Sequence, residues 1–77
     1  MSDPDGGPPA KRSLVLRGHR TSVSLEDEFW EAFRALAALE GRSLNDLAAE
    51  IDAARGPRRG LASAIRVHVL RAAQTRP

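Results

Sequence analysis

The chain contains no cysteine and only two histidines, His19 and His68. Without cysteine it can form neither a disulfide framework nor a thiolate metal site, and two histidines are too few for a structural zinc centre. No segment approaches the ~18 consecutive apolar residues of a membrane span, and no charged start is followed by an apolar secretion signal. The sequence therefore predicts a cytoplasmic protein that has no metal, no other cofactor and no membrane partner.

The chain is also short, at 77 residues. A single core of this size seldom supplies more than about 3–5 kcal/mol, and small scaffolds usually need a metal, disulfides or oligomerisation. Because the composition excludes the first two, self-association is what remains. We therefore expect one domain that is completed by a second copy of the chain.

Acidic residues are missing from two stretches of the chain. Residues 11–25 carry a net charge of +4 and residues 53–77 carry +6, whereas residues 26–52 carry −6. A basic stretch without a carboxylate suits a polyanion partner. For the C-terminal arginines, a solvated surface in an arginine-rich chain is an equally good interpretation.

Residues 19–25 alternate polar and apolar side chains, which is typical of a strand. The alternation predicts one outward face and one hidden face: Arg20, Ser22 and Ser24 outward, and Thr21, Val23 and Leu25 hidden. The sequence predicts no second strand nearby in the chain. A lone exposed strand is unstable in water, so we expect it to pair with the same strand of another copy.

The segments before this strand are predicted to be less regular. Residues 1–12 are interpreted as a disordered tail, because three of the five prolines and two glycines lie among the first ten residues. Residues 13–17 are extended again, but Gly18 is a natural place for a bend. We therefore expect residues 13–17 to form a separate strap that packs Leu14 and Leu16 on a dimer. The core would span residues 13–55, and residues 56–77 would form a C-terminal helix and tail.

Three amphipathic helices follow the strand. The first is predicted from Glu26 to Glu40, the second from Ser43 to about Ala54, and the third from Leu61 to Ala73. Ser43 with Asp46 three residues later is a capping-box-like start for the second helix. The apolar faces predict a shared dimer core of Val23, Leu25, Phe29, Phe33, Leu36, Leu47, Ile51 and Ile65.

The order strand, helix, Gly-x-Ser turn and helix resembles the ribbon-helix-helix DNA-binding family of Arc- and MetJ-type repressors. The resemblance is carried by the run from Arg20 to Leu25 and by Gly41-Arg42-Ser43-Leu44. The runs 17–26 and 63–67 are similar to a bacterial subgroup of short ribbon-helix-helix proteins. The resemblance implies a mostly α fold with one short strand, in an intertwined homodimer that shares a two-stranded antiparallel ribbon, plus an added third C-terminal helix.

The resemblance also implies a function and a set of contacts. The protein would be a non-enzymatic transcriptional regulator, acting as a repressor, that inserts its ribbon into the major groove of double-stranded DNA. Arg20, Ser22 and Ser24 would contact base edges. The implied phosphate contacts are the helix start at Ser43 and Leu44, with Arg42 and Arg17.

Other interpretations of these residues are open. The chain could be an antitoxin or adaptor whose main partner is a protein, bound through the basic C-terminal helix. Glu26, Asp27 and Glu28 could suggest acid–base catalysis, but their place in the first turn of a helix explains them better. Trp30 is expected in the core rather than as a platform for stacking bases.

Overall fold

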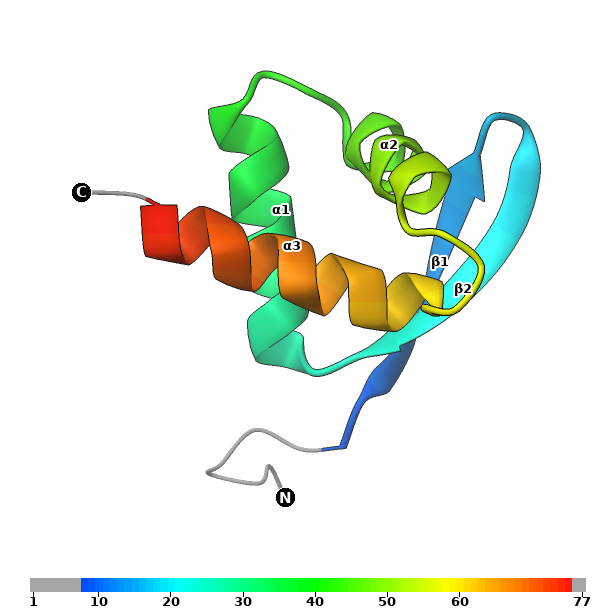
Figure 1. The fold of residues 1–77 in the computed structure, drawn as a ribbon, viewed down its shortest axis with the longest axis horizontal. Coiled ribbons are helices and arrows are strands. Elements are labelled where there is room, and N and C mark those ends of the chain that lie inside the picture. Colours follow the sequence, from blue (N-terminus) through cyan, green and yellow to red (C-terminus); the bar gives the residue numbers. More distant parts are fainter. Residues whose placement is uncertain (1–7, 76–77) are drawn as a thin grey trace.

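The computed structural model describes residues 8–75, which form a two-stranded sheet followed by three helices (Figure 1). The elements are β1 (Ala10–Leu16), β2 (His19–Leu25), α1 (Asp27–Leu39), α2 (Leu44–Ala54) and α3 (Leu61–Thr75). The three predicted helices are confirmed, and each boundary lies within about two residues of the expected one. Apolar residues at helical spacing explain this agreement.

The strand β2 does not stand alone, and the expectation of a lone strand is wrong. It pairs antiparallel with β1 of the same chain, from Ala10 opposite Leu25 to Leu16 opposite His19. The predicted strap of residues 13–17 is therefore the larger part of a hairpin strand. The predicted tail of residues 1–12 lies partly outside the described residues, and its last three residues belong to β1.

A two-residue turn, Arg17-Gly18, joins the two strands. Both residues have positive φ angles, 50° and 86°. This is the geometry of a type I′ turn, whose twist matches that of the strands it joins. Gly18 adopts it without a steric penalty, whereas Arg17 holds a left-handed conformation that is uncommon for a residue with a Cβ atom.

The hairpin has one buried face and one exposed face. Leu14 and Leu16 of β1 and Val23 and Leu25 of β2 point inward and are buried, and their neighbours along each strand are exposed. The predicted alternation in β2 is confirmed. Because cross-strand partners share a face, the turn at Gly18 places Leu14 and Leu16 on the same side as the apolar residues of β2.

Backbone capping fixes the corner between α1 and α2. Gly41, with φ of 68°, follows α1, and the Arg42 N–H donates to the Ala37 carbonyl at 3.0 Å. Ser43 then caps α2 because its Oγ accepts from the Asp46 N–H at 3.0 Å. Both the glycine end and the serine start were predicted.

The core lies between the inner face of the hairpin and the three helices. Seven of the eight residues predicted for a dimer core are buried within the single chain, and Phe29 is half-buried. The apolar stripe of α3 is likewise covered by α1, α2 and β2 of its own chain. A second copy is therefore not required to bury these side chains. The buried residues are Leu14, Leu16, Val23, Leu25, Phe33, Leu36, Ala37, Leu47, Ala48, Ile51, Ala64, Ile65 and Val69.

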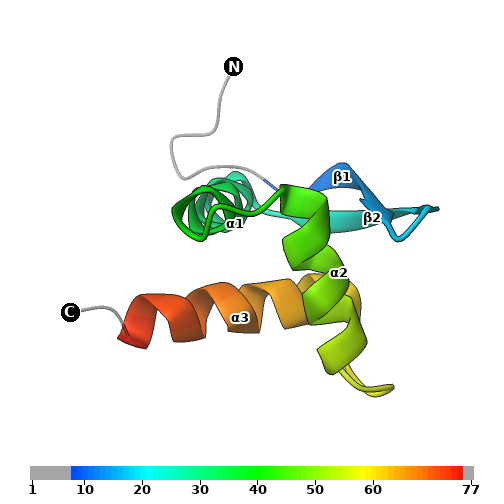
Figure 2. The same cartoon turned by 90° about the horizontal axis from the view of Figure 1, so that it is seen from above.

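The outer face of the hairpin and α3 lie on opposite sides of the molecule, whereas the inner face of the hairpin contacts α3. Figure 2 shows the hairpin and α1 at one level and α3 at another, with α2 running between them. Because the inner face of the hairpin points toward the helices, its outer face points away from α3. None of the helices among residues 8–75 is long and apolar enough to cross a lipid bilayer.

Candidate nucleic-acid interface

The outer face of the hairpin carries a small set of polar and basic side chains. Arg20, Ser22 and Ser24 of β2 are all exposed, as predicted. Their cross-strand partners are Val15, Ser13 and Lys11 of β1, which are exposed as well. This outer face, defined as these six residues, contains two cations, three hydroxyls and no carboxylate.

Sequence reasoning missed the half of the outer face that comes from β1. Lys11 and Ser13 were assigned to a tail and a strap, yet they lie directly opposite Ser24 and Ser22. The signal in the sequence was weak: residues 11–16 are three polar residues followed by three apolar ones, without alternation, and only the glycine-containing two-residue turn between the two extended runs indicated a hairpin. Because Arg17 precedes the glycine in place of the usual asparagine or aspartate, the turn was not recognised.

The start of α2 lies beside the hairpin. The Val15 N–H, which points away from β2, donates to Asn45 Oδ1 at 3.0 Å. Within the described residues, the N–H groups of Leu44 and Asn45 in the first turn of α2 have no acceptor. Arg17 of the turn and Arg42 both line a shallow depression of about 370 Å³ between the hairpin and α2, which the acidic residues Asp46 and Glu50 line as well. Of the predicted phosphate contacts, this geometry brings together Arg17, Arg42 and the helix start.

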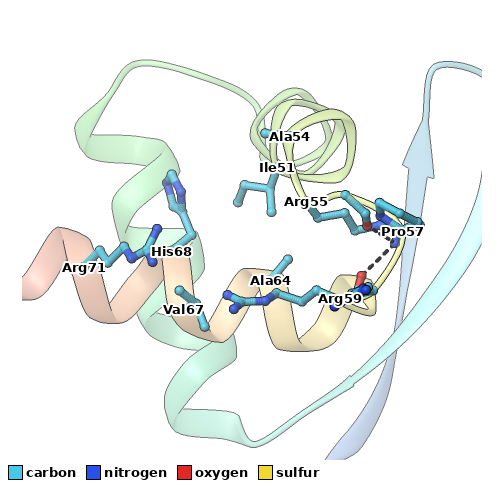
Figure 3. A pocket seen from close by; sticks show the side chains of 11 residues that line it. Ile51, Ala54, Arg55, Pro57, Arg59, Ala64, Val67, His68 and Arg71 are labelled. Atoms are coloured by element: carbon cyan, nitrogen blue, oxygen red, sulfur yellow. Dashed lines mark hydrogen bonds between the residues drawn. The ribbon is translucent and has the colours of Figure 1, made fainter.

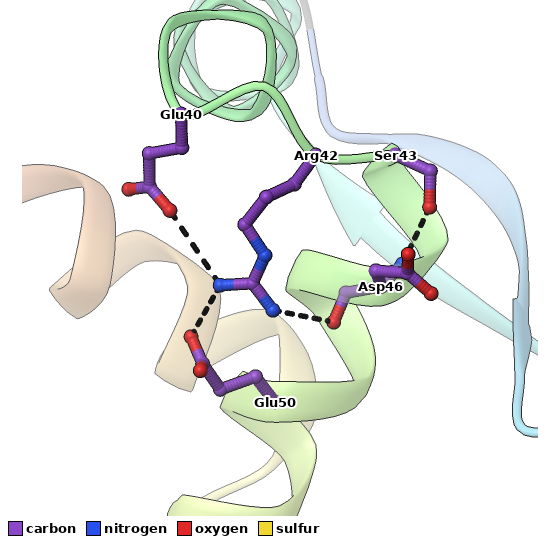
Figure 4. Close-up of polar contacts among 5 residues, drawn as sticks. All are labelled: Glu40, Arg42, Ser43, Asp46 and Glu50. Atoms are coloured by element: carbon purple, nitrogen blue, oxygen red, sulfur yellow. Dashed lines mark hydrogen bonds and ion pairs between the residues drawn. The ribbon is translucent and has the colours of Figure 1, made fainter.

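Arg42 is held by neighbouring groups rather than pointing freely to solvent (Figure 4). Its guanidinium donates to Glu50 at 2.7 Å and to the Asp46 carbonyl at 3.3 Å, and it lies 3.5 Å from Glu40. The hydrogen bond that Arg42 donates to Glu50 is the main reason that the pKa of Arg42 is raised. The same bond lowers the pKa of Glu50. Arg42 thus joins the end of α1 to α2.

Two arginines fix the junction between the hairpin and α1. Arg12 of β1 forms an ion pair with Asp27 and lies over the Trp30 ring, 5.3 Å from its centroid. On the other side, Arg66 of α3 lies 2.9 Å from Glu26 and donates to the Ser24 carbonyl at 3.0 Å.

These contacts give the acidic residues at the start of α1 a structural role. A backbone hydrogen bond, followed by the Arg66 hydrogen bond, lowers the pKa of Glu26. Asp27 is likewise occupied by Arg12. Trp30 packs against Phe33 at a centroid distance of 6.2 Å, as expected for a residue at the edge of the core. Among residues 8–75, no group of three or more histidines, cysteines or carboxylates is placed to hold a metal ion.

A known protein family matches this arrangement of a strand ribbon and helices. The family described as "Ribbon-helix-helix domain" matches residues 9–73, which is most of the chain. The chain belongs to the ribbon-helix-helix domain family. Neither the curated proteins nor the solved structures contain a significant match to it. Ribbon-helix-helix domains are generally non-enzymatic regulatory domains of DNA-binding transcriptional regulators and antitoxins.

Proposed function

We propose that this ribbon-helix-helix protein is a homodimeric transcriptional regulator, acting as a repressor, that binds double-stranded DNA through the outer face of its hairpin. The observation that carries the proposal is the composition of that face: Arg20, Lys11 and three serines, with no carboxylate. A major groove about 12 Å wide accepts a two-stranded ribbon, and in the dimer proposed below this ribbon would be the central pair of β2 strands. The working location of the protein would be the cytoplasm, on DNA.

Arg20 is the side chain best suited to read a base. An arginine can form a bidentate hydrogen bond with guanine O6 and N7, and a serine hydroxyl can donate to or accept from most base edges. Ser22 and Ser24 therefore accompany Arg20 as proposed base contacts. Lys11 and Ser13, on the neighbouring strand, extend the same surface. A ribbon with only one arginine and short hydroxyl side chains would recognise a short sequence at each half-site.

Phosphate contacts would come from the edge of this surface. The free N–H groups of Leu44 and Asn45, which follow the N-cap residue Ser43, can hold a phosphate at the start of α2. Arg17, at the tip of the hairpin, supplies a nearby positive charge. Arg42 could contribute only by exchanging its contacts with Glu40 and Glu50 for a phosphate. Such contacts make binding weaken as salt rises.

The second edge of β2 is where a partner copy would pair. The Val15 backbone points away from β2. Because outward and inward backbone groups alternate along an antiparallel pair, its partner Arg20 and the alternate residues Ser22 and Ser24 turn theirs toward the free edge of β2. The Ser24 carbonyl already accepts from Arg66, so the pairing would centre on Arg20 and Ser22. A second copy could pair there antiparallel, with Ser22 near the twofold axis.

Ser22→Pro tests this pairing. Its missing N–H would lie on the free edge, where proline is tolerated in a strand, so the hairpin should remain folded. The matched control is Ser13→Pro, on the outer edge of β1. We expect only Ser22→Pro to shift the protein to a monomer in sedimentation equilibrium. A wild-type protein that is monomeric at all concentrations, or a dimer unaffected by Ser22→Pro, contradicts this mode of association.

DNA recognition is tested by mapping the DNA bound in the genome at a stated salt concentration. The mapping is repeated with Arg20→Ala and with the control Arg34→Ala, which removes an exposed arginine from α1. A good bidentate contact contributes about 1–3 kcal/mol of discrimination, so Arg20→Ala should lose about tenfold or more in affinity for the preferred site. Unchanged binding by Arg20→Ala in a mobility-shift assay would refute the groove-reading proposal.

An antitoxin or adaptor role is the second candidate function. The family includes antitoxins, and a basic surface around α3 favours a protein partner. That helix lies on the other side of the molecule from the outer face of the hairpin (Figure 2). Binding of a protein there and binding of DNA by the hairpin are therefore compatible.

A further inference from the structure

A cleft of about 550 Å³ lies between the end of α2, the loop that follows it, and α3. Ile51 and Ala54 of α2 form one wall, and Ala64 and Val67 of α3 form the other. The proposed DNA contacts do not include any of the residues that line it. The cleft is therefore a feature that recognition by the hairpin does not explain.

The charged residues of the cleft come from its two ends. Figure 3 shows Arg55 and Pro57 at one end and His68 and Arg71 at the other, while the side chain labelled Arg59 starts at the loop and reaches between Ala64 and Val67. Arg58 also lines the cleft, and none of the lining residues is acidic. Arg71 lies ten positions after Leu61 in α3, a length of about 15 Å at ~1.5 Å per residue.

One of these arginines builds the cleft rather than serving as a binding group. Arg55 donates to Asp52 at 2.7 Å, and its Nη1 donates to the carbonyls of Gly56 and Arg59. These bonds fix the conformation of the loop after α2, in which Gly56 has a φ of 76°.

The other arginines of the cleft are available to a ligand. Among the described residues, no carboxylate lies within ion-pair distance of Arg58, Arg59 or Arg71. All three are exposed. Glu50, which lies near His68, is already paired with Arg42.

We propose that this cleft binds an acidic segment of a partner protein, in which apolar side chains lie between two groups of carboxylates. The carboxylates would pair with Arg58 and Arg59 at one end and with Arg71 at the other. The apolar side chains would lie on Ile51, Ala64 and Val67. An extended peptide covers ~3.3 Å per residue, so about five residues span the distance between the two ends.

The apolar floor distinguishes such a segment from other polyanions. A nucleic-acid backbone would satisfy the arginines but would leave the floor without an apolar partner. A single phosphate or small dicarboxylate would reach only one end of a cleft of this length. The position of the cleft, away from the outer face of the hairpin, lets it act while DNA is bound. The proposal is therefore independent of the proposed DNA recognition.

The test uses the full-length, isotope-labelled protein and a synthetic peptide with two glutamates at each end and two leucines between them. A control peptide carries serines in place of the leucines and so has the same charge. The leucine peptide should shift the backbone amide resonances of residues 54–71 and leave those of the hairpin unchanged. It should bind at least about fivefold more tightly than the serine peptide, since the two leucines, even when buried only in part, remove apolar surface from water.

Matched variants separate the charges from the floor. Arg71→Glu and Arg59→Glu should each weaken the leucine peptide about fivefold or more, whereas Arg34→Glu, an equal charge change on α1, should not. Val67→Ser should weaken the leucine peptide and leave the serine peptide unaffected, and Val15→Ser, on the hairpin, should change neither. Thermal melts of each variant establish that it is folded.

Three results would overturn the proposal. The first is equal binding of the two peptides, which would mean that the cleft attracts any polyanion. The second is that Arg34→Glu and Arg71→Glu weaken peptide binding equally, which would mean that binding depends only on the overall charge of the protein. The third is a short DNA duplex that displaces the peptide and shifts the cleft resonances, because nucleic acid would then be the ligand. Arg71→Glu should retain DNA binding, so a failure of the proposed peptide binding would leave the proposed DNA recognition by the hairpin intact.

Discussion

Truncation of Ile65 provides the sharpest test of the idea that α3 completes the core within one chain. Ile65 is fully buried among the hairpin and the other two helices, and Leu70 on the same helix is 53% exposed. Ile65→Ala and Leu70→Ala each remove three carbon atoms. The first should cost about 3–4 kcal/mol, made up of the lost transfer energy and a cavity term. The second should cost about 0.5 kcal/mol or less.

That cost is large for a protein of this size. A chain of 77 residues is expected to have a total stability of about 4–12 kcal/mol. At roughly 4–8 °C for each kcal/mol, Ile65→Ala should lower the Tm by about 15–30 °C, and the charged variant Ile65→Asp should not fold.

Urea denaturation, followed by circular dichroism at two protein concentrations, measures both variants. The midpoint for Ile65→Ala should fall at both concentrations, because the lost contacts lie within one chain. Equal losses for Ile65→Ala and Leu70→Ala would refute this reasoning and would indicate that α3 is a free docking element. A loss that disappears at high concentration would instead indicate that a second copy covers this helix.

Three further predictions concern individual residues. Ser43→Ala removes the side-chain acceptor for the Asp46 N–H and should lower the free energy of unfolding by about 1 kcal/mol. The control Ser63→Ala, within α3, should be nearly neutral, and urea denaturation midpoints compare the two variants. The pKa of Glu26 is lowered in the folded state, so the contribution of Glu26 to stability is present above its unfolded pKa and is lost as the pH falls through its folded pKa. Glu26→Gln should therefore reduce the fall of the Tm at acid pH. An unchanged dependence of the Tm on acid pH would argue against this role of Glu26. Arg17→Asn should raise the Tm by a few degrees because asparagine tolerates a positive φ better than arginine does, while Arg20→Asn, in regular strand, should not.

The helices could be predicted from the sequence because their signals are local. Phe29, Phe33 and Leu36 recur at helical spacing, Gly41 ends α1, and Ser43 begins α2. The outward position of Arg20 and its neighbours followed from the period of two in a strand. Each of these inferences needed only the residues within one element, and each is confirmed by the structure.

The pairing of the hairpin and the contacts of the arginines could not be predicted in the same way. Leu14 and Leu16 were recognised as apolar, but their partners depended on a turn that lacks the usual asparagine or aspartate. Arg42 looked like a phosphate ligand because it lies beside a helix start. Its pairing with Glu50, eight residues later, depends on the angle between α1 and α2. Sequence spacing does not give that angle.

The hairpin within a single chain also affects how this protein would assemble. Two strands joined by a two-residue turn close a very short loop, and hairpins of this kind form in about 1–10 μs. The chain can therefore fold without waiting for an encounter with another copy. Association would then be the docking of two folded units rather than their mutual folding. Subunits labelled with two different fluorophores would then exchange between dimers at the rate of dimer dissociation, which would be much faster than global unfolding. The amount of dimer on DNA could therefore follow changes in protein concentration within the cell.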